Sequence, residues 1–257
     1  MISVITPTYN TSREVLARTW ASLKAQTFTD WEWVVWDDST TPDTFQQLYG
    51  FASDERYRLR VHRSHTHSGS VGQVKRWGFM AAEGDILVEL DHDDELTPDA
   101  LQCVSDAFQV PSVGFVFSDW AEIFPDGSSG KYPAGWAFGY GREEWLEDLR
   151  LWSLSVPVIN ADTLRHIVSV PNHVRAWRAS VYRALNGHDP ALPVADDYDL
   201  IVRTALVTEW AHIPRMLYRQ HISPATTQRV KNGEIQERVR LLASKYEAAI
   251  SGRFSNV

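Results

Sequence analysis

The sequence predicts an α/β fold in which a mainly parallel sheet carries helices on both faces. Short apolar runs, rich in β-branched and aromatic residues, alternate with segments of helical periodicity through the first hundred residues. This alternation is typical of parallel strands joined by helices. Three of the apolar runs end in polar clusters. Because ligands of open α/β sheets bind beyond the carboxyl ends of the strands, the fold class also predicts where a site would lie.

Hydrophobic patterning sets the elements of the first half. We expect strands at ISVIT (2–6), WEWVVW (31–36), RLRVH (58–62) and DILVEL (85–90). Helices are expected from a capping box at Thr11-x-x-Glu14, over residues 42–51, over 71–81, and from Thr97-Pro98 onward. A hydroxyl side chain at the N-cap followed by proline is a frequent helix start.

The second half is less regular. We expect a strand at VGFVFSDW (113–120), a turn at FPDGSSG (124–130) and a short amphipathic helix at REEWLEDLRLW (142–152). Further helices are expected over 180–187, closed by Gly187, over 194–206 and around 235–246, with a strand just before His221. Asp196 and Asp197 open the helix at 194–206, where the helix dipole favours negative charge. Taken alone, this pair indicates helix capping, and His221 alone indicates nothing specific.

Composition limits the class of protein. A length of 257 residues with 44% hydrophobic content predicts one large globular domain or two small ones. A formal net charge of -8 argues against nucleic acid as the main partner. The single cysteine, Cys103, excludes an intramolecular disulfide, and no apolar run approaches the length of a membrane span. Because the N-terminus also lacks the pattern of a signal peptide, we expect a cytoplasmic protein.

A dense acidic cluster follows the fourth expected strand. Asp91, Asp93, Asp94 and Glu95 place four carboxylates within five positions. Like charges this close repel one another, so the cluster indicates either a solvated loop or a bound cation. Two more polar clusters, Thr8-Tyr9-Asn10 and Asp37-Asp38-Ser39, follow the first and second strands. Three clusters on one sheet edge favour a site over ordinary loop polarity.

Five segments, in this order, resemble the family 2 glycosyltransferases, the inverting, metal-dependent enzymes of GT-A type. They are SVITPTYN (3–10), VVWDDS (34–39), GFMAAEGDILVELDHDDELTPDAL (78–101), VRAWRASVYRALNGHDPALPVADDYDLIVRTAL (174–206) and LYRQH (217–221). A lone D-x-D is a weak motif, whereas the ordered set is specific. The resemblance implies a single GT-A domain over residues 1–257. About 1–110 would bind the nucleotide sugar, and about 111–257 would bind the acceptor and carry the catalytic base.

The resemblance also implies site residues for the donor. Asp38 would accept a hydrogen bond from a ring N–H of uracil, since UDP is the expected nucleotide, and Asp91 would contact the ribose or act through water. The local pattern KRWG around Lys75 departs from the family's usual RNxG. The full nucleotide-binding set implied is Pro7, Thr8, Tyr9, Asp38, Lys75, Asp91 and His92.

For the metal and the chemistry, the resemblance implies Asp91, Asp93 and His221 as ligands of Mn²⁺ or Mg²⁺. A hard cation suits the charge that develops on a diphosphate leaving group. Asp197 matches the second acid of the family's Glu-Asp pair, the catalytic base. Asp196 stands where the family has glutamate. Contacts to the acceptor or to phosphate are expected from Arg175, Trp177, Arg178 and Asp196.

Two alternatives remain open from the residues alone. A phosphatase of the haloacid dehalogenase type uses D-x-D-x-T/V after a strand, which Asp91 to Asp94 match but Glu95 does not. A non-catalytic module that binds a sugar nucleotide or a glycan would share the fold but would not need Asp197. The acceptor is left open among a glycan, a lipid-linked sugar and another hydroxyl compound, with nucleic acid less favoured. The sugar and the oligomeric state are also open.

Overall fold

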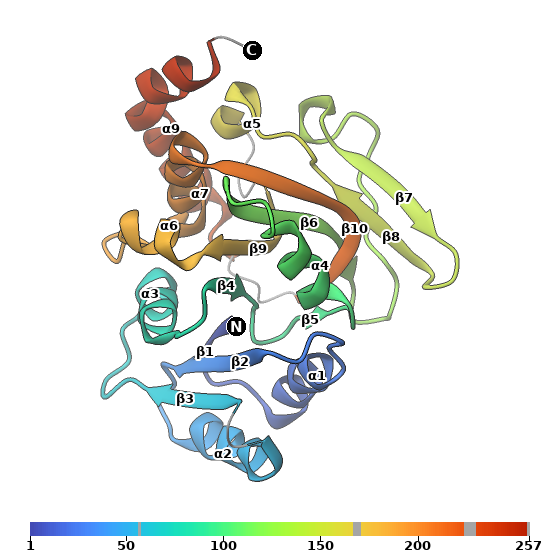
Figure 1. Ribbon diagram of the computed structural model, residues 1–257, viewed down its shortest axis with the longest axis vertical. Helices are drawn as coiled ribbons and strands as arrows, with labels where there is room; N and C mark the ends of the chain where they lie inside the picture. Colours follow the sequence, from blue (N-terminus) through green and yellow to red (C-terminus); the bar gives the residue numbers. More distant parts are fainter. Residues whose placement is uncertain (56–57, 167–170, 224–229, 256–257) are drawn as a thin grey trace.

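The computed structural model describes residues 1–55, 58–166, 171–223 and 230–255 (Figure 1). Its strands are β1 (Ile2–Thr8), β2 (Trp31–Asp37), β3 (Leu59–Arg63), β4 (Ile86–Glu89), β5 (Glu95–Leu96), β6 (Val113–Ile123), β7 (Arg142–Leu146), β8 (Leu151–Ser155), β9 (His173–Arg178) and β10 (Glu209–His221). Its helices are α1 (Arg13–Lys24), α2 (Asp43–Glu55), α3 (Val71–Ala81), α4 (Ala100–Ala107), α5 (Ala161–His166), α6 (Ala179–Ala184), α7 (Asp196–Val207) and α9 (Asn232–Phe254), with a 3₁₀ turn at Ala137–Gly139.

One twisted sheet runs through both halves of the chain, in the order β3-β2-β1-β4-β9-β6-β10-β5. Strands β1 to β4 are parallel where they pair, and β6 is parallel to β10. Between these two blocks lies β9, which is antiparallel to both β4 and β6. The predicted α/β class is confirmed, and β9 joins its two parallel blocks into a single domain.

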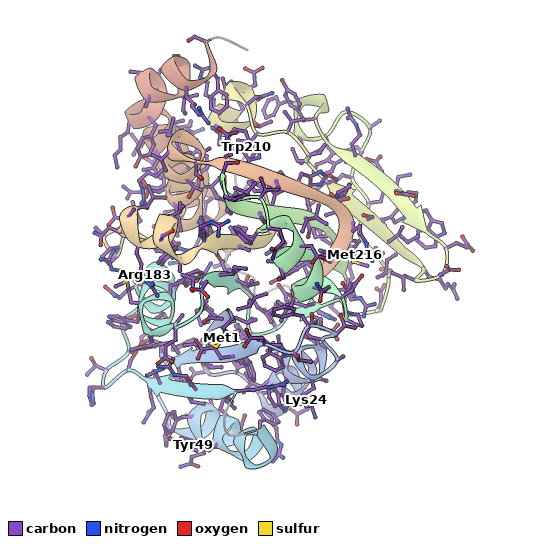
Figure 2. All side chains as sticks on the ribbon, in the orientation of Figure 1. Met1, Lys24, Tyr49, Arg183, Trp210 and Met216 are labelled. Carbon is purple, nitrogen blue, oxygen red and sulfur yellow. The ribbon has the colours of Figure 1, made fainter. Side chains whose placement is uncertain are left out.

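Helices cover both faces of the sheet, because side chains alternate in direction along each buried strand. On β2, Trp33 and Val35 pack in a cluster with α1 and α4, whereas Val34 packs in a second cluster with α3, α6, α7 and α9. Figure 2 shows side chains filling the space between these layers. Arg183 of α6 extends to α3 and donates to the carbonyl of Ala82 at 3.1 Å (Figure 2).

The prediction of a helix at 142–152 is wrong. This segment forms the antiparallel hairpin β7–β8, with Trp145 opposite Trp152 and Leu154 paired to Trp120 of β6 (Figure 1). Leu154 is fully buried, while Trp145 is 40% exposed. The apolar residues of the segment 142–152 fit helical spacing as well as a strand pattern. Pairing with β6 decides that strands form.

Two helix starts lie later than expected. The N-cap of α1 is Ser12, whose hydroxyl accepts from the Val15 amide, and not Thr11. Helix α4 begins at Ala100, because Thr97 accepts from the Ala100 amide and bonds the Asp99 carboxylate in a preceding turn. No helix within the described residues is both long and apolar enough to cross a membrane.

Candidate active site

The carboxyl ends of β1, β2 and β4 meet at one edge of the sheet, as expected for parallel neighbours. Pro7 and Thr8 end β1 in buried positions. The Thr8 hydroxyl donates to Asp37 Oδ1 at 3.2 Å, and the Asp38 amide donates to the Thr8 carbonyl at 2.9 Å. These bonds tie the first two polar clusters to each other.

A second loop closes over these two strand ends. The buried Asp38 carboxylate accepts from the Ser68 amide at 3.0 and 3.1 Å and from the Ser68 hydroxyl at 2.8 Å. The Nδ1 atom of His67 lies 2.9 Å from Asp38 Oδ2. The same imidazole stacks on Tyr9 with ring centroids 4.6 Å apart, and Tyr9 is 47% exposed. Tyr9 and Asp38 are therefore brought together, with His67 between them.

The acidic turn after β4 is held by a buried tyrosine. The Tyr218 hydroxyl accepts from the Asp91 amide at 3.2 Å and donates to Asp94 Oδ2 at 2.7 Å. The His221 amide donates to Asp94 Oδ1 at 2.7 Å, and His173 stacks on Tyr218 with centroids 3.9 Å apart. Asp94 is therefore a buried support of this turn.

The acidic turn and His173 of β9 together offer the ligand types of a metal site. One ligand atom from each of Asp91, Asp94 and His173 lies within 4.8 Å of the others. Burial raises the pKa of Asp91 and of Asp94, and the neighbouring Asp93 and Asp91 carboxylates raise that of Asp94 further. Burial also lowers the pKa of His173, which keeps its imidazole neutral and able to ligate. A bound cation stabilises the ionised form of clustered carboxylates, because it offsets the repulsion between their charges. Asp91, Asp94 and His173 therefore fit a divalent metal.

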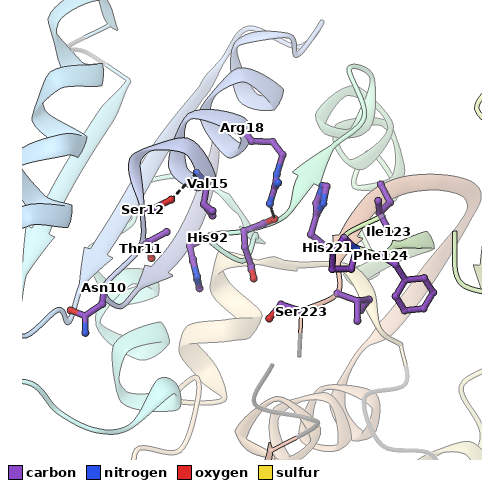
Figure 3. A pocket seen from close by; sticks show the side chains of 13 residues that line it. Asn10, Thr11, Ser12, Val15, Arg18, His92, Ile123, Phe124, His221 and Ser223 are labelled. Atoms are coloured by element: carbon purple, nitrogen blue, oxygen red, sulfur yellow. Dashed lines mark hydrogen bonds between the residues drawn. The ribbon is translucent and has the colours of Figure 1, made fainter. Parts of the chain in front are cut away.

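A cavity of about 390 Å³ lies beside the acidic turn (Figure 3). Both Asp93 and His221 line it. Arg18 donates to the Asp93 carbonyl at 2.7 Å, and His221 Nε2 lies 2.8 Å from Glu95 Oε2. The other lining residues are Asn10, Thr11, Ser12, Val15, His92, Ile123, Phe124, Pro125, Ile222 and Ser223. Asp93, His92 and His221 are thus brought together at one cavity, whereas Asp91 groups with Asp94 and His173.

A chain of ion pairs leads from β4 to the start of α7. Lys75 Nζ lies 2.6 Å from Glu89 Oε1, and Arg175 Nη2 lies 2.8 Å from the same oxygen. Arg175 Nη1 donates to Asp197 Oδ2 at 2.8 Å, and the Tyr198 amide donates to Asp197 Oδ1 at 2.8 Å. Burial raises the pKa of Asp197, but the Arg175 and Lys75 cations outweigh it and hold that pKa below its usual range. Asp197, with a side chain 21% exposed, is therefore an ionised carboxylate.

The preceding residue, Asp196, has a different environment. Its side chain is 9% exposed, and its Oδ2 lies 3.9 Å from His188 Nε2. A Cβ on Gly72 would lie only 2.9 Å from the Asp196 Cβ, so α3 approaches α7 closely at this glycine. Burial, with added repulsion from Asp197 and Glu89, raises the pKa of Asp196 to about 7. The two adjacent acids thus differ, because Asp197 bonds the Arg175 guanidinium, whereas Asp196 bonds no guanidinium of the described residues.

Residues 3–158 match the family described as Glycosyl transferase family 2. The chain belongs to this family.

Curated relatives are similar over most of this chain but are much longer. The O-antigen biosynthesis protein RfbC of Myxococcus xanthus is 26% identical over 85% of this chain and 16% of its own length. The chondroitin synthase of Escherichia coli is 23% identical over 92% of this chain and 31% of its own length. The chain therefore spans less than a third of either relative.

Solved structures share the fold. S. aureus TarS in complex with UDP-GlcNAc aligns with a TM-score of 0.70 and 17% identity, over 98% of this chain and 71% of that one. The mannosyltransferase PcManGT from Pyrobaculum calidifontis, in complex with GDP-Man and Mn²⁺, gives a TM-score of 0.67 and 17% identity, over 95% and 64%. At this identity the likeness shows the GT-A fold alone.

Two residues that were expected to contact the acceptor or phosphate lie elsewhere in the structure. Trp177 is fully buried, and its Nε1 donates to Thr204 Oγ1 at 3.0 Å. Arg178 donates to the carbonyls of Val113 and Phe108. Because β9 is antiparallel to β4, Arg178 lies opposite Ile86 at the amino end of β4, away from the site edge. Their positions do not support the expected contacts with acceptor or phosphate.

Several contacts of the site differ from those predicted or were not predicted. Lys75 was expected to face the nucleotide, but its ammonium is buried against Glu89. Glu89 carried the clearest signal, since it is a carboxylate inside an apolar strand run and needs a buried cation there. Nothing in the sequence beyond their residue types indicated that His188, His67 and Ser68 belong to the site.

Proposed function

We propose that this chain is an inverting, metal-dependent glycosyltransferase that moves a sugar from a nucleotide diphosphate sugar to an acceptor hydroxyl. The observation that carries the proposal is the partly exposed Asp197 carboxylate, joined through Arg175 to Glu89 of the strand that leads into the acidic turn. Residues of about 1–110 would bind the donor, with UDP as the expected nucleotide. Residues of about 111–257 would bind the acceptor and supply the base.

Asp197 would act as the base. An acceptor hydroxyl is a poor nucleophile until its proton is removed, and a positioned carboxylate typically contributes about 10²–10⁴-fold to such a step. The pKa of Asp197, held below its usual range, keeps the carboxylate ionised but also makes it a weak base, so the proton would pass to it only as the new glycosidic bond forms. With one base and a direct displacement, the anomeric centre inverts. The proton moves from the acceptor oxygen to an Asp197 oxygen as the new glycosidic bond forms and the bond to the diphosphate breaks.

Asp91, Asp93 and His221 would hold the cation, with Asp94 and His173 adjacent to Asp91. When bound, Mn²⁺ or Mg²⁺ supplies positive charge that stabilises the diphosphate leaving group. Asp38 and Tyr9, together with Pro7 and Thr8, would bind the nucleobase of the donor. An exposed tyrosine offers a stacking face for it, and a buried carboxylate offers a hydrogen-bond acceptor. PcManGT with GDP-Man and Mn²⁺ supports this combination of donor and metal on the same fold.

The test is a panel of UDP, GDP and dTDP sugars, measured with and without Mn²⁺ by thermal shift and by release of the nucleotide diphosphate. We expect metal-dependent stabilisation by one nucleotide class and turnover that Asp197→Asn abolishes while donor binding persists. An active Asp197→Asn enzyme would contradict the assignment of the base. Stabilisation without turnover on any acceptor would support a non-catalytic binding module. Family membership does not favour the phosphatase alternative, which phosphorylation of Asp91 would reveal.

A further inference from the structure

Glu89 is a charged residue in the interior of the protein. It is the last residue of β4 and is 3% exposed, with the fully buried Val88 and Leu90 on either side. Burying a carboxylate is unfavourable unless it is paired and hydrogen-bonded. Here one oxygen accepts from two cations, Lys75 at 2.6 Å and Arg175 at 2.8 Å. Two cations on one oxygen identify Glu89 as a carboxylate anion.

The partner of Glu89 is also the partner of Asp197. Arg175 faces Glu89 directly across the antiparallel pair β4–β9, and its two terminal nitrogens bond two different carboxylates. Side-chain exposure rises along this chain, from 3% at Glu89 and 4% at Arg175 to 21% at Asp197. The buried end is thus fixed within the sheet, and the end that reaches solvent is the carboxylate at the start of α7.

We propose that Glu89 is a positioning residue for Asp197 and acts through the guanidinium of Arg175; this inference rests on the proposed function. A guanidinium is a rigid planar fork, so two bonds at separate nitrogens fix its orientation. Arg175 Nε has no hydrogen-bond partner among the described residues. Without Glu89, Arg175 would lose one of the two bonds that fix its guanidinium, and the position of the Asp197 carboxylate that it bonds would be less defined.

The position of Glu89 in its strand links the proposed base to the residues proposed for donor and metal. Glu89 lies two residues before Asp91, where the acidic turn begins. One short strand therefore places both the residues proposed for donor and metal and the anchor of the proposed base. Because group transfer is sensitive to displacements of about 1 Å, a common anchor keeps the base and the donor in a constant relation.

The test compares Glu89→Gln with a matched control, Glu32→Gln. Glu32 is a buried strand carboxylate that also pairs with an arginine, Arg60 at 3.1 Å, but it lies on β2 and contacts Ser3 and the Glu83 amide. Each variant is assayed for UDP binding with Mn²⁺, and for kcat and KM with the sugar nucleotide that the panel identifies.

For Glu89→Gln we expect kcat to fall by about 10–100-fold with UDP affinity within about threefold of wild type, since positioning acts on the chemical step. For Glu32→Gln we expect lower thermal stability and kcat within about twofold. A folded Glu89→Gln enzyme with wild-type kcat, or an equal loss of kcat in both variants, would overturn the proposal. If Glu89→Gln fails to fold, Glu89→Asp, which keeps the charge on a shorter side chain, takes its place with the same expected split.

A crystal structure of Glu89→Gln separates this inference from the proposed function. We expect the 2.8 Å contact between Arg175 and Asp197 to be lost or Asp197 to become disordered. Retention of that contact would refute positioning even if the protein turned over no donor. Absence of transfer by the wild type, together with loss of the contact in the variant, would count against the proposed function and leave the positioning geometry supported.

Discussion

Asp196→Asn should remove a pH-dependent loss of stability that the wild-type protein carries. The pKa of Asp196 is raised from 3.8 to about 7, chiefly by burial. Between these values the folded protein holds a proton that the unfolded chain does not, so stability is greatest at low pH and falls as pH rises towards 7. With 9% of the side chain exposed, solvent screening is slight.

Each pKa unit corresponds to about 1.4 kcal/mol, so between pH 5 and pH 7 this group removes at most about 2–3 kcal/mol from the folded state. Asparagine has no charge to bury and escapes this loss. For a protein of this size, 1 kcal/mol shifts Tm by about 2–4 °C, so Tm of the variant relative to wild type should rise by about 4–10 °C from pH 5 to pH 7.

The assay is thermal unfolding at half-unit intervals from pH 5 to pH 8 in the presence of a chelator, so that metal binding does not contribute. The exposed Asp148→Asn serves as a control for the change of charge without burial. His188, whose pKa burial lowers to about 3, gives the opposite slope below its ordinary value of 6.5. A constant Tm difference across this range would refute the reasoning that burial keeps Asp196 protonated.

Three further outcomes follow from other contacts. Arg175→Met should cost about 3–5 kcal/mol, because it removes the buried guanidinium that Glu89 and Asp197 share. Arg60→Met, at a side chain 32% exposed, should cost about 1 kcal/mol; equal losses by denaturant titration would contradict the burial argument. His67→Ala should bind UDP about three- to tenfold more tightly in calorimetry, because it frees the stacking face of Tyr9 and removes the imidazole that competes for Asp38 Oδ2; weaker binding would instead make His67 a nucleotide contact. Ala195→Gly should raise Tm by about 2–4 °C, since Ala195 has φ 60° before α7 and a left-handed alanine costs about 1 kcal/mol or more; a lower Tm would show that the alanine side chain stabilises more than its strain costs.

The parallel strands were predictable because their apolar runs are buried on both sides and are bounded by polar residues. Val34, with both faces of its strand covered, illustrates the pattern that made β2 recognisable. The hairpin β7–β8 was not predictable, since Trp145, Leu149 and Trp152 fit helical spacing and only pairing with β6 selects strands. Local periodicity cannot decide between two patterns when a distant strand supplies the deciding contacts.

For the site, the sequence predicted candidate residues but not their connections. The acidic turn was noticed because a carboxylate cluster follows an expected strand, whereas Asp197 alone indicated helix capping and was singled out by the resemblance to family 2. The pairing of Arg175 with Glu89 and Asp197 was not predicted, because the antiparallel direction of β9 decides that Arg175 reaches the site edge while Arg178 lies at the far end of β4. Strand direction in a mixed sheet depends on the whole chain, so no local pattern shows it. The expected ligand and base roles stay predictions for the experiments above.

The placement of β9 also has a consequence for how the chain folds. Strands β1 to β4 can pair as soon as about ninety residues have been synthesised, yet the neighbour of β4 in the sheet is β9, which begins at residue 173. Until then β4 is an open edge of apolar residues, which favours association between nascent chains. We therefore expect a fragment ending near residue 110 to be poorly soluble, although it contains all of the proposed nucleotide-binding residues. The donor half depends on the later strand to cover its edge.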